Sequence, residues 1–242
     1  MIKNAKVFIK RAPLFIPNKI IFWGFTLISF FTGHVNKKLR KEHYRENGDK
    51  NIDSRIFCID KYIENQAEWV KVKLGSGKHS NMEYSGCTII AVYNALLNLK
   101  DSDRNILNII DDFEKKGLAL KGDFGISPFY AYRFFKKRGY KAKYITSRNK
   151  DLIRSFGDKF DTFIVTFYWD KKNIFNKLHT VNISKSDDGF VAHNMYFKKS
   201  DGKYHAKEAC NDLFEAVEKL SKSGAPISII GIKRQKMGRE KC

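Results

Sequence analysis

The sequence lacks the cysteine and histidine clusters that hold metals or build disulfide frameworks. Its 242 residues include four cysteines, and no two of them form a CxxC pair or stand with histidines at zinc spacing. We therefore expect no metal and no cofactor. There is also no Gly-rich phosphate loop and no aromatic RNA-binding signature, so no specific nucleic acid is expected as a partner.

Acidic residues are scarce relative to basic ones. Lys and Arg number 46 against 26 Asp and Glu, a net charge of +20. Such a charge favours anionic partners such as lipid headgroups or acidic surfaces, although a merely lysine-rich surface gives the same total. Hydrophobic residues make up 43% of the chain and aromatic residues 14%, which is enough to bury a core.

A hydrophobic run long enough to cross a membrane is also missing. Residues 20–33 are uncharged and apolar, with basic residues on both sides, but a spanning helix needs about 20 such residues. No small-residue cleavage site follows, which disfavours a cleaved secretory signal. The run is an uncleaved anchor, a helix lying on anionic lipid, or a helix packed on the domain.

These features divide the chain into a basic N-terminal segment, 1–50, and a domain, 51–242. The protein is expected to be membrane-associated through the segment or cytoplasmic. Because basic residues flank the run on both sides, the side of the membrane stays open. The sequence indicates no oligomeric state.

The domain begins with helical patterns and continues with strands. Helices are predicted from Cys87, over 101–116, and from Pro128 onward, with Ser127 as the expected N-cap of the last and Gly139 just past its end. Strands are predicted at 140–146, 160–169, 179–184, 189–197 and 226–233, with a short helix at 151–157 and an amphipathic helix at 206–224. Asp188-Gly189 marks a hairpin turn. This order indicates an α+β fold.

Cys87 stands where a reactive thiol is expected. A helix N-terminus favours the thiolate, and Gly86 leaves room for a close approach. The hairpin places His179, at the start of one strand, beside Asn194, at the end of the next, so that Asn194 can hold the imidazole. The alternative is that Cys87 is a packed apolar residue, because free cysteine is among the most buried residue types.

Other polar and aromatic residues are assigned roles outside catalysis. His193 must face away from His179 if Asn194 faces toward it, because neighbouring residues of a strand point to opposite sides. Trp169 and Asp170 precede the histidine strand and could line a cleft, but core packing is the expected role of Trp169. The cysteines at 58, 210 and 242 are interpreted as structural or incidental.

The stretch "NMEYSGCTIIAVYNALLNL", followed downstream by "LHTVNISKSDDGFVAHN", resembles the bacterial papain-like cysteine peptidases, in particular the double-glycine leader peptidases of bacteriocin exporters and their stand-alone relatives. The resemblance implies a papain-like fold in which an N-terminal helical part packs on an antiparallel sheet. It implies Cys87 as nucleophile, His179 as general base and Asn194 as the orienting residue. Asn81 stands where the family has the Gln of its oxyanion hole, with a reach one methylene shorter.

The function expected from this resemblance is hydrolysis of a peptide or protein substrate by a Cys-His-Asn triad. Two other functions stay open. The first is a catalytically inactive papain-fold module that binds a peptide in its cleft. The second is a basic, membrane-associated interaction protein, in which the N-terminal segment binds an anionic membrane surface.

Overall fold

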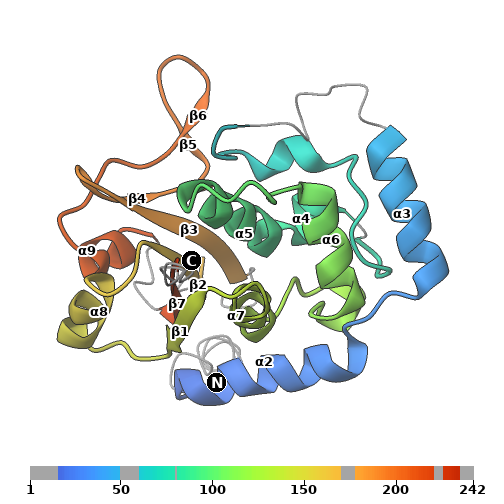
Figure 1. The fold of residues 1–242 in the computed structure, drawn as a ribbon, viewed down its shortest axis with the longest axis horizontal. Helices are drawn as coiled ribbons and strands as arrows, with labels where there is room; N and C mark the ends of the chain where they lie inside the picture. The colour runs from blue at the N-terminus through green and yellow to red at the C-terminus, as the bar shows by residue number, and fades with distance from the viewer. Residues whose placement is uncertain (1–15, 50–59, 80, 170–177, 221–225, 235–242) are drawn as a thin grey trace, which may run out of the picture.

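The structure of the protein is a computed structural model that describes residues 16–49, 60–79, 81–169, 178–220 and 226–234. A five-stranded antiparallel sheet runs through its middle, in the order β1-β7-β2-β3-β4 (Figure 1). Its strands are β1 (Lys141–Ile145), β2 (Thr162–Tyr168), β3 (Leu178–Ser186), β4 (Gly189–Ala192) and β7 (Pro226–Lys233). Two short strands, β5 (Phe197–Lys198) and β6 (Tyr204–His205), pair separately. The predicted α+β class is confirmed.

Helices cover both faces of this sheet (Figure 1). The α-helices are α2 (Asn18–Thr32), α3 (Lys37–Asp49), α4 (Met82–Ser85), α5 (Cys87–Asn98), α6 (Ile106–Lys115), α7 (Pro128–Lys137), α8 (Lys150–Gly157) and α9 (Leu213–Glu218). Two 3₁₀ turns, η1 (Gln66–Trp69) and η2 (Leu120–Gly122), lie between them. The core accordingly has two main parts, one between the sheet and α5, α6 and α7, the other between the sheet and α8 and α9.

Strand β2 separates the two parts of the core. Every residue of β2 is buried, and its side chains alternate between the two faces. Ile164 belongs to the cluster around α5, whereas Phe163 and Val165 belong to the cluster around α8 and α9. This double burial explains why residues 160–169 read as one continuous apolar run instead of an alternating pattern.

Two predicted helices begin later than their patterns suggested. Helix α6 begins at Ile106, because Asn105 caps it by accepting from the N–H of Leu107 at 2.9 Å. Helix α9 begins at Leu213, whereas the pattern predicted a start at 206. Residues before it extend along β4 instead, where Phe190 and Cys210 exchange backbone hydrogen bonds of 2.9 Å. The end of that predicted helix, 221–224, lies outside the described residues.

The apolar run of the N-terminal segment forms α2, which packs on the domain along its lower edge in Figure 1. Phe22 stacks on Tyr144 with ring centroids 4.7 Å apart, and the side-chain amide of Asn18 donates to the carbonyl of Pro226 at 2.6 Å. In the part of the chain that the structure describes, the search for a helix of sufficient length and apolarity to span a bilayer found none.

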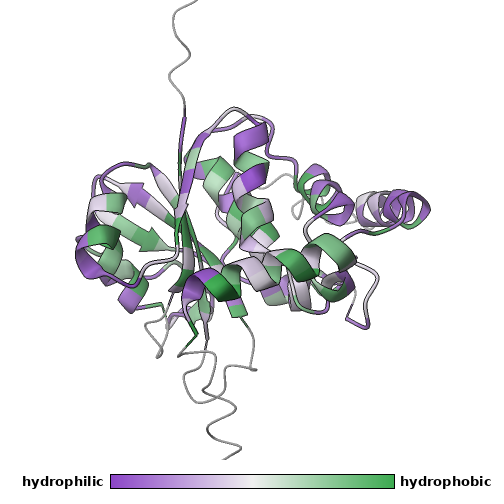
Figure 2. Ribbon diagram, turned by 90° about the horizontal axis from the view of Figure 1, so that it is seen from below, coloured by the Kyte–Doolittle hydropathy of each residue, from purple (hydrophilic) through white to green (hydrophobic). Residues whose placement is uncertain are grey.

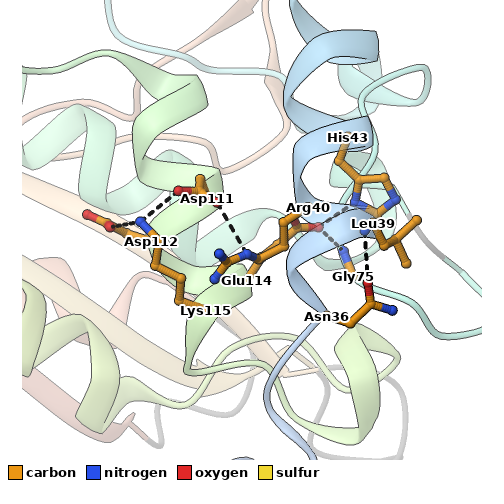
Figure 3. A network of polar contacts seen from close by, with 9 residues as sticks. All are labelled: Asn36, Leu39, Arg40, His43, Gly75, Asp111, Asp112, Glu114 and Lys115. Atoms are coloured by element: carbon orange, nitrogen blue, oxygen red, sulfur yellow. Dashed lines mark hydrogen bonds and ion pairs between the residues drawn. The ribbon is translucent and has the colours of Figure 1, made fainter.

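A buried contact between a histidine and a carboxylate joins α3 to the rest of the domain (Figure 3). The carboxylate of Glu114 lies 2.7 Å from Nδ1 of His43 and also accepts from the N–H of Gly75 at 2.8 Å. These contacts join α3, α6 and the loop that leads to α4. The contact with Gly75 thereby holds the loop that leads through α4 to Cys87.

Candidate active site

A pocket opens where the N-terminus of α5 meets the start of β3. Its walls are formed by six separate stretches of the chain, and they include Gln66, Glu83, Cys87, Phe124, Trp169, His179 and Tyr196. The sequence predicted Cys87 at the start of a helix and His179 at the start of a hairpin strand. In the structure both residues border this pocket.

Cys87 is the first residue of α5, and its free thiol is half-buried. Gly86 allows α4 to turn directly into α5, because a Cβ at this position would lie 2.5 Å from the carbonyl oxygen of Met82. Burial raises the pKa of the Cys87 thiol, and hydrogen bonds with Thr180 and Thr88 lower it. Burial outweighs these hydrogen bonds, so the net shift of the thiol pKa is upward.

His179 lies buried among aromatic rings. Trp169 contacts its imidazole edge to face at a centroid distance of 5.0 Å, and Tyr196 and Phe167 lie at 5.6 and 5.8 Å. This burial lowers the pKa of His179 to about 4, against the opposing effect of the Asn194 carbonyl. The imidazole is therefore neutral at neutral pH.

The tautomer of His179 follows from its contact with the main chain of Asn194. Nε2 lies 2.9 Å from the backbone carbonyl oxygen of Asn194. Because a carbonyl only accepts, Nε2 carries the proton and Nδ1 keeps its lone pair. Nδ1 is thus the basic nitrogen of the site.

The group of Asn194 that contacts His179 is therefore the backbone carbonyl, not the side chain that the sequence predicted. Strand β4 ends at Ala192, and the chain then turns, with a φ of 60° at Asn194. The turn directs the backbone carbonyl toward His179, while the side-chain oxygen accepts from the N–H of Gln66 at 3.1 Å. The predicted neighbours do meet, through a different group from the one expected.

The carboxylate of Glu64 holds the turn at Asn194 in place. One oxygen of Glu64 accepts from the backbone N–H of Asn194 at 2.8 Å, and the other lies 2.6 Å from Nδ1 of His193. Nε2 of His193 lies 2.8 Å from the hydroxyl of Ser184, and Tyr62 stacks on its ring at 3.8 Å. His193 is thus held in this cluster, not beside His179.

Asn81 is not among the pocket walls. Its side-chain oxygen caps α4 by accepting from the N–H of Tyr84 at 2.9 Å. The amide that does border the pocket belongs to Gln66, whose Nε2 donates to the carbonyls of Met82 and Glu83 at 3.0 and 2.7 Å. Gln66 therefore braces the short helix that precedes Cys87.

Several residues of the site were missed or misassigned. Trp169, expected in the core, borders the pocket and is 38% exposed. Its place one residue after the fully buried β2 is the only signal that could have indicated this. Glu64 precedes the short η1 turn and Gln66 begins it, and no sequence periodicity points to either residue. Asp170 and the cysteines at 58 and 242 lie outside the described residues.

Comparisons of the chain with protein-family models, curated proteins and solved structures found no match. Among the described residues, no group of three or more His, Cys, Asp and Glu side chains is arranged to hold a metal ion. The geometry of the site combines a thiol at a helix start, a neutral imidazole with its basic nitrogen free of the carbonyl contact, and a cleft with aromatic walls.

Proposed function

We propose that the protein is a cysteine peptidase with a papain-like site, in which Cys87 is the nucleophile and His179 the general base. The observation that carries this proposal is that both residues border one pocket while the Asn194 carbonyl fixes the imidazole tautomer. A nucleophile, a base and a group that orients the base are the parts that thiol-dependent acyl transfer needs.

The pKa directions indicate how the reaction begins. Burial disfavours both the thiolate and the imidazolium, so the resting pair is a neutral thiol and a neutral imidazole. As the sulfur attacks the amide carbonyl carbon, the thiol proton passes to Nδ1 of His179. The carbonyl oxygen becomes an oxyanion, which the N–H of Cys87 can stabilise because the first N–H groups of a helix have no partner within it.

The second half of the cycle restores the site. The tetrahedral intermediate collapses, the C–N bond breaks, and His179 gives its proton to the leaving amine. A water molecule then attacks the thioester while His179 accepts one of its protons. The C–S bond breaks, the carboxylic acid leaves, and the proton on His179 returns to the sulfur of Cys87.

The pocket walls suggest the type of side chain that a substrate presents. Aromatic rings of Tyr84, Trp169 and Tyr196 stand beside the carboxylates of Glu83 and Asp123. The backbone N–H groups of residues 78 and 79 hold the pKa of Asp123 below its usual value, so this carboxylate is charged at neutral pH. We expect a peptide with an apolar or a basic side chain next to the cleaved bond.

The test is digestion of a mixed peptide library, read by mass spectrometry. Wild type should cleave a subset of peptides, and Cys87→Ala should abolish cleavage without a change in melting temperature. Cys210→Ala is the matched control, because this cysteine is buried in the cluster around α8 and α9 and lies away from the pocket. Cleavage by Cys87→Ala at the wild-type rate would refute the proposal.

One observation favours the second candidate, a module that binds a peptide without cleaving it. The amide of Gln66 is committed to two carbonyls, and Asn81 does not border the pocket, so neither supplies a second oxyanion donor. The loss of one such donor slows acyl transfer by roughly 100- to 1,000-fold. Peptides that quench tryptophan fluorescence equally in wild type and Cys87→Ala, with no product in either, would establish this candidate instead.

A further inference from the structure

Helix α2 is apolar on both of its sides. Phe22 and Phe25 pack into the domain, but the opposite side exposes large apolar side chains to solvent. They are Ile20, Trp23, Leu27, Ile28, Phe30 and Phe31, and Phe30 and Phe31 are 65% and 69% exposed. The outer face of a surface helix is ordinarily polar. In Figure 2, which looks at the molecule from the side of α2, the helix is mostly green and white.

This apolar face continues toward the pocket. The backbone N–H of Leu120 donates to the hydroxyl of Thr32 at 2.9 Å, and the ring of Phe124 contacts Phe25 at 5.4 Å. Leu120 and Phe124 are themselves 49% and 47% exposed. Because Phe124 also forms part of the pocket wall, the apolar face reaches the edge of the candidate active site.

Cationic side chains lie beside the face. Lys19 lies in the groove between the exposed side chains, and Arg133 lies over the ring of Phe129, which contacts Trp23 at 5.4 Å. Asp123 is the only acidic residue between 116 and 150. The same stretch of sequence contains ten Lys and Arg residues, and one of them, Arg148, donates to the side-chain oxygen of Asn18 at the start of α2 at 2.7 Å.

We propose that the exposed face of α2 docks on an anionic lipid surface, with the helix lying in the plane of the interface. Apolar side chains would enter the acyl boundary, Trp23 would lie at the level of the headgroups, and the surrounding cations would bind lipid phosphates. A second copy of the chain fits less well, because it would bring a second set of cations and another charge of +20 against the first.

Docking in this manner places the pocket beside the bilayer. If the proposed peptidase function holds, its substrates are peptides at a membrane surface. The docking itself does not depend on catalysis. Cys87→Ala should therefore bind lipid as wild type does, which separates a failure of one proposal from a failure of the other.

The experiment is flotation of the full-length chain with two kinds of vesicle, one of phosphatidylcholine alone and one of phosphatidylcholine with about 30% phosphatidylglycerol. Wild type should float with the anionic vesicles and lose most of that binding in high salt. The double variant Leu27→Glu/Phe30→Glu should lose at least tenfold in bound fraction. Leu152→Glu is the matched control, because Leu152 is a 43% exposed leucine on α8, and it should float as wild type does.

Three results would overturn the proposal. The first is that wild type fails to float, and the second is that the double variant floats as well as Leu152→Glu. The third is a dimer in sedimentation velocity that the double variant dissociates while vesicle binding is absent, which would assign the face to a second copy. Circular dichroism of each variant establishes that the substituted chain is folded.

Discussion

Replacement of His179 should make the protein less sensitive to acid. The imidazole is 7% exposed, and its folded-state pKa of about 4 lies below the ordinary value of 6.5. Between these two values the unfolded chain binds more protons than the folded chain, so stability falls as the pH falls from 6.5 toward 4. Above pH 6.5 the group makes no difference.

The magnitude follows from the two pKa values. Lowering the pH from 7.5 to 5 should destabilise the wild-type fold through His179 by about 2 kcal/mol. His179→Gln removes the titrating group while its side-chain amide can still donate to the carbonyl of Asn194. The variant should therefore lose about 2 kcal/mol less than wild type over the same pH interval, since the other histidines are common to both chains and cancel.

The assay is urea unfolding at pH 7.5 and pH 5, followed by circular dichroism, with the free energy extrapolated to water. The quantity to compare is the difference between the two pH values, so a constant destabilisation by the substitution does not matter. An equal loss in wild type and variant would mean that His179 is exposed and titrates normally. The site as described would then be incorrect.

Two further predictions concern the support of the site. Glu64→Gln should lower the free energy of unfolding by about 1–3 kcal/mol and slow the acylation of Cys87, because an amide cannot accept from both the Asn194 N–H and the neighbouring imidazole. Urea unfolding measures the stability, and the rate of Cys87 labelling measures the acylation. An unchanged labelling rate would count against a positioning role for Glu64. Gly189→Ala should cost about 2 kcal/mol or more, because its φ is 119° and a Cβ would lie 2.3 Å from the Cys210 carbonyl oxygen. Gly202→Ala, at a φ of 75° with no atom within 4 Å of the added Cβ, should cost only about 1 kcal/mol of strain, and equal losses in both would contradict the packing argument.

Local signals in the sequence predicted the parts of the site that local physics determines. Gly86 and the helical spacing after it predicted that a helix begins at Cys87, and α5 begins there. The Asp188-Gly189 turn predicted the hairpin, in which Ser186 pairs with Gly189. These elements depend on neighbours in the chain, which is why a single sequence was sufficient to place them.

Contacts between distant segments were not predictable in this way. Glu64 lies 130 residues from the backbone N–H that it holds, and nothing around it is periodic. The antiparallel bridge between Phe190 and Cys210 overrode a helical pattern that would have carried a longer α9. The role of the Asn194 carbonyl depends on one positive φ after the end of β4, which the alternation of side chains does not reveal.

The roles of α2 also depended on three-dimensional packing. Its length is short for a membrane span, and the sequence left an uncleaved anchor, an interfacial helix and a packed helix as separate alternatives. In the structure the inner side is packed on the domain and the outer side stays apolar and exposed. The inner side of α2 is therefore the packed helix of the third alternative, and the outer side is the face that we propose for lipid docking.

The most direct test of the central claim is acylation of Cys87 by a peptide p-nitrophenyl ester, followed by stopped-flow absorbance and intact mass spectrometry. The account predicts a burst of about one nitrophenolate per chain, with the acyl mass on Cys87, and a burst at least about 100-fold slower in His179→Gln because the base is gone. A burst that persists in Cys87→Ala, or whose rate is unchanged in His179→Gln, would contradict the assignment of these two residues as nucleophile and base.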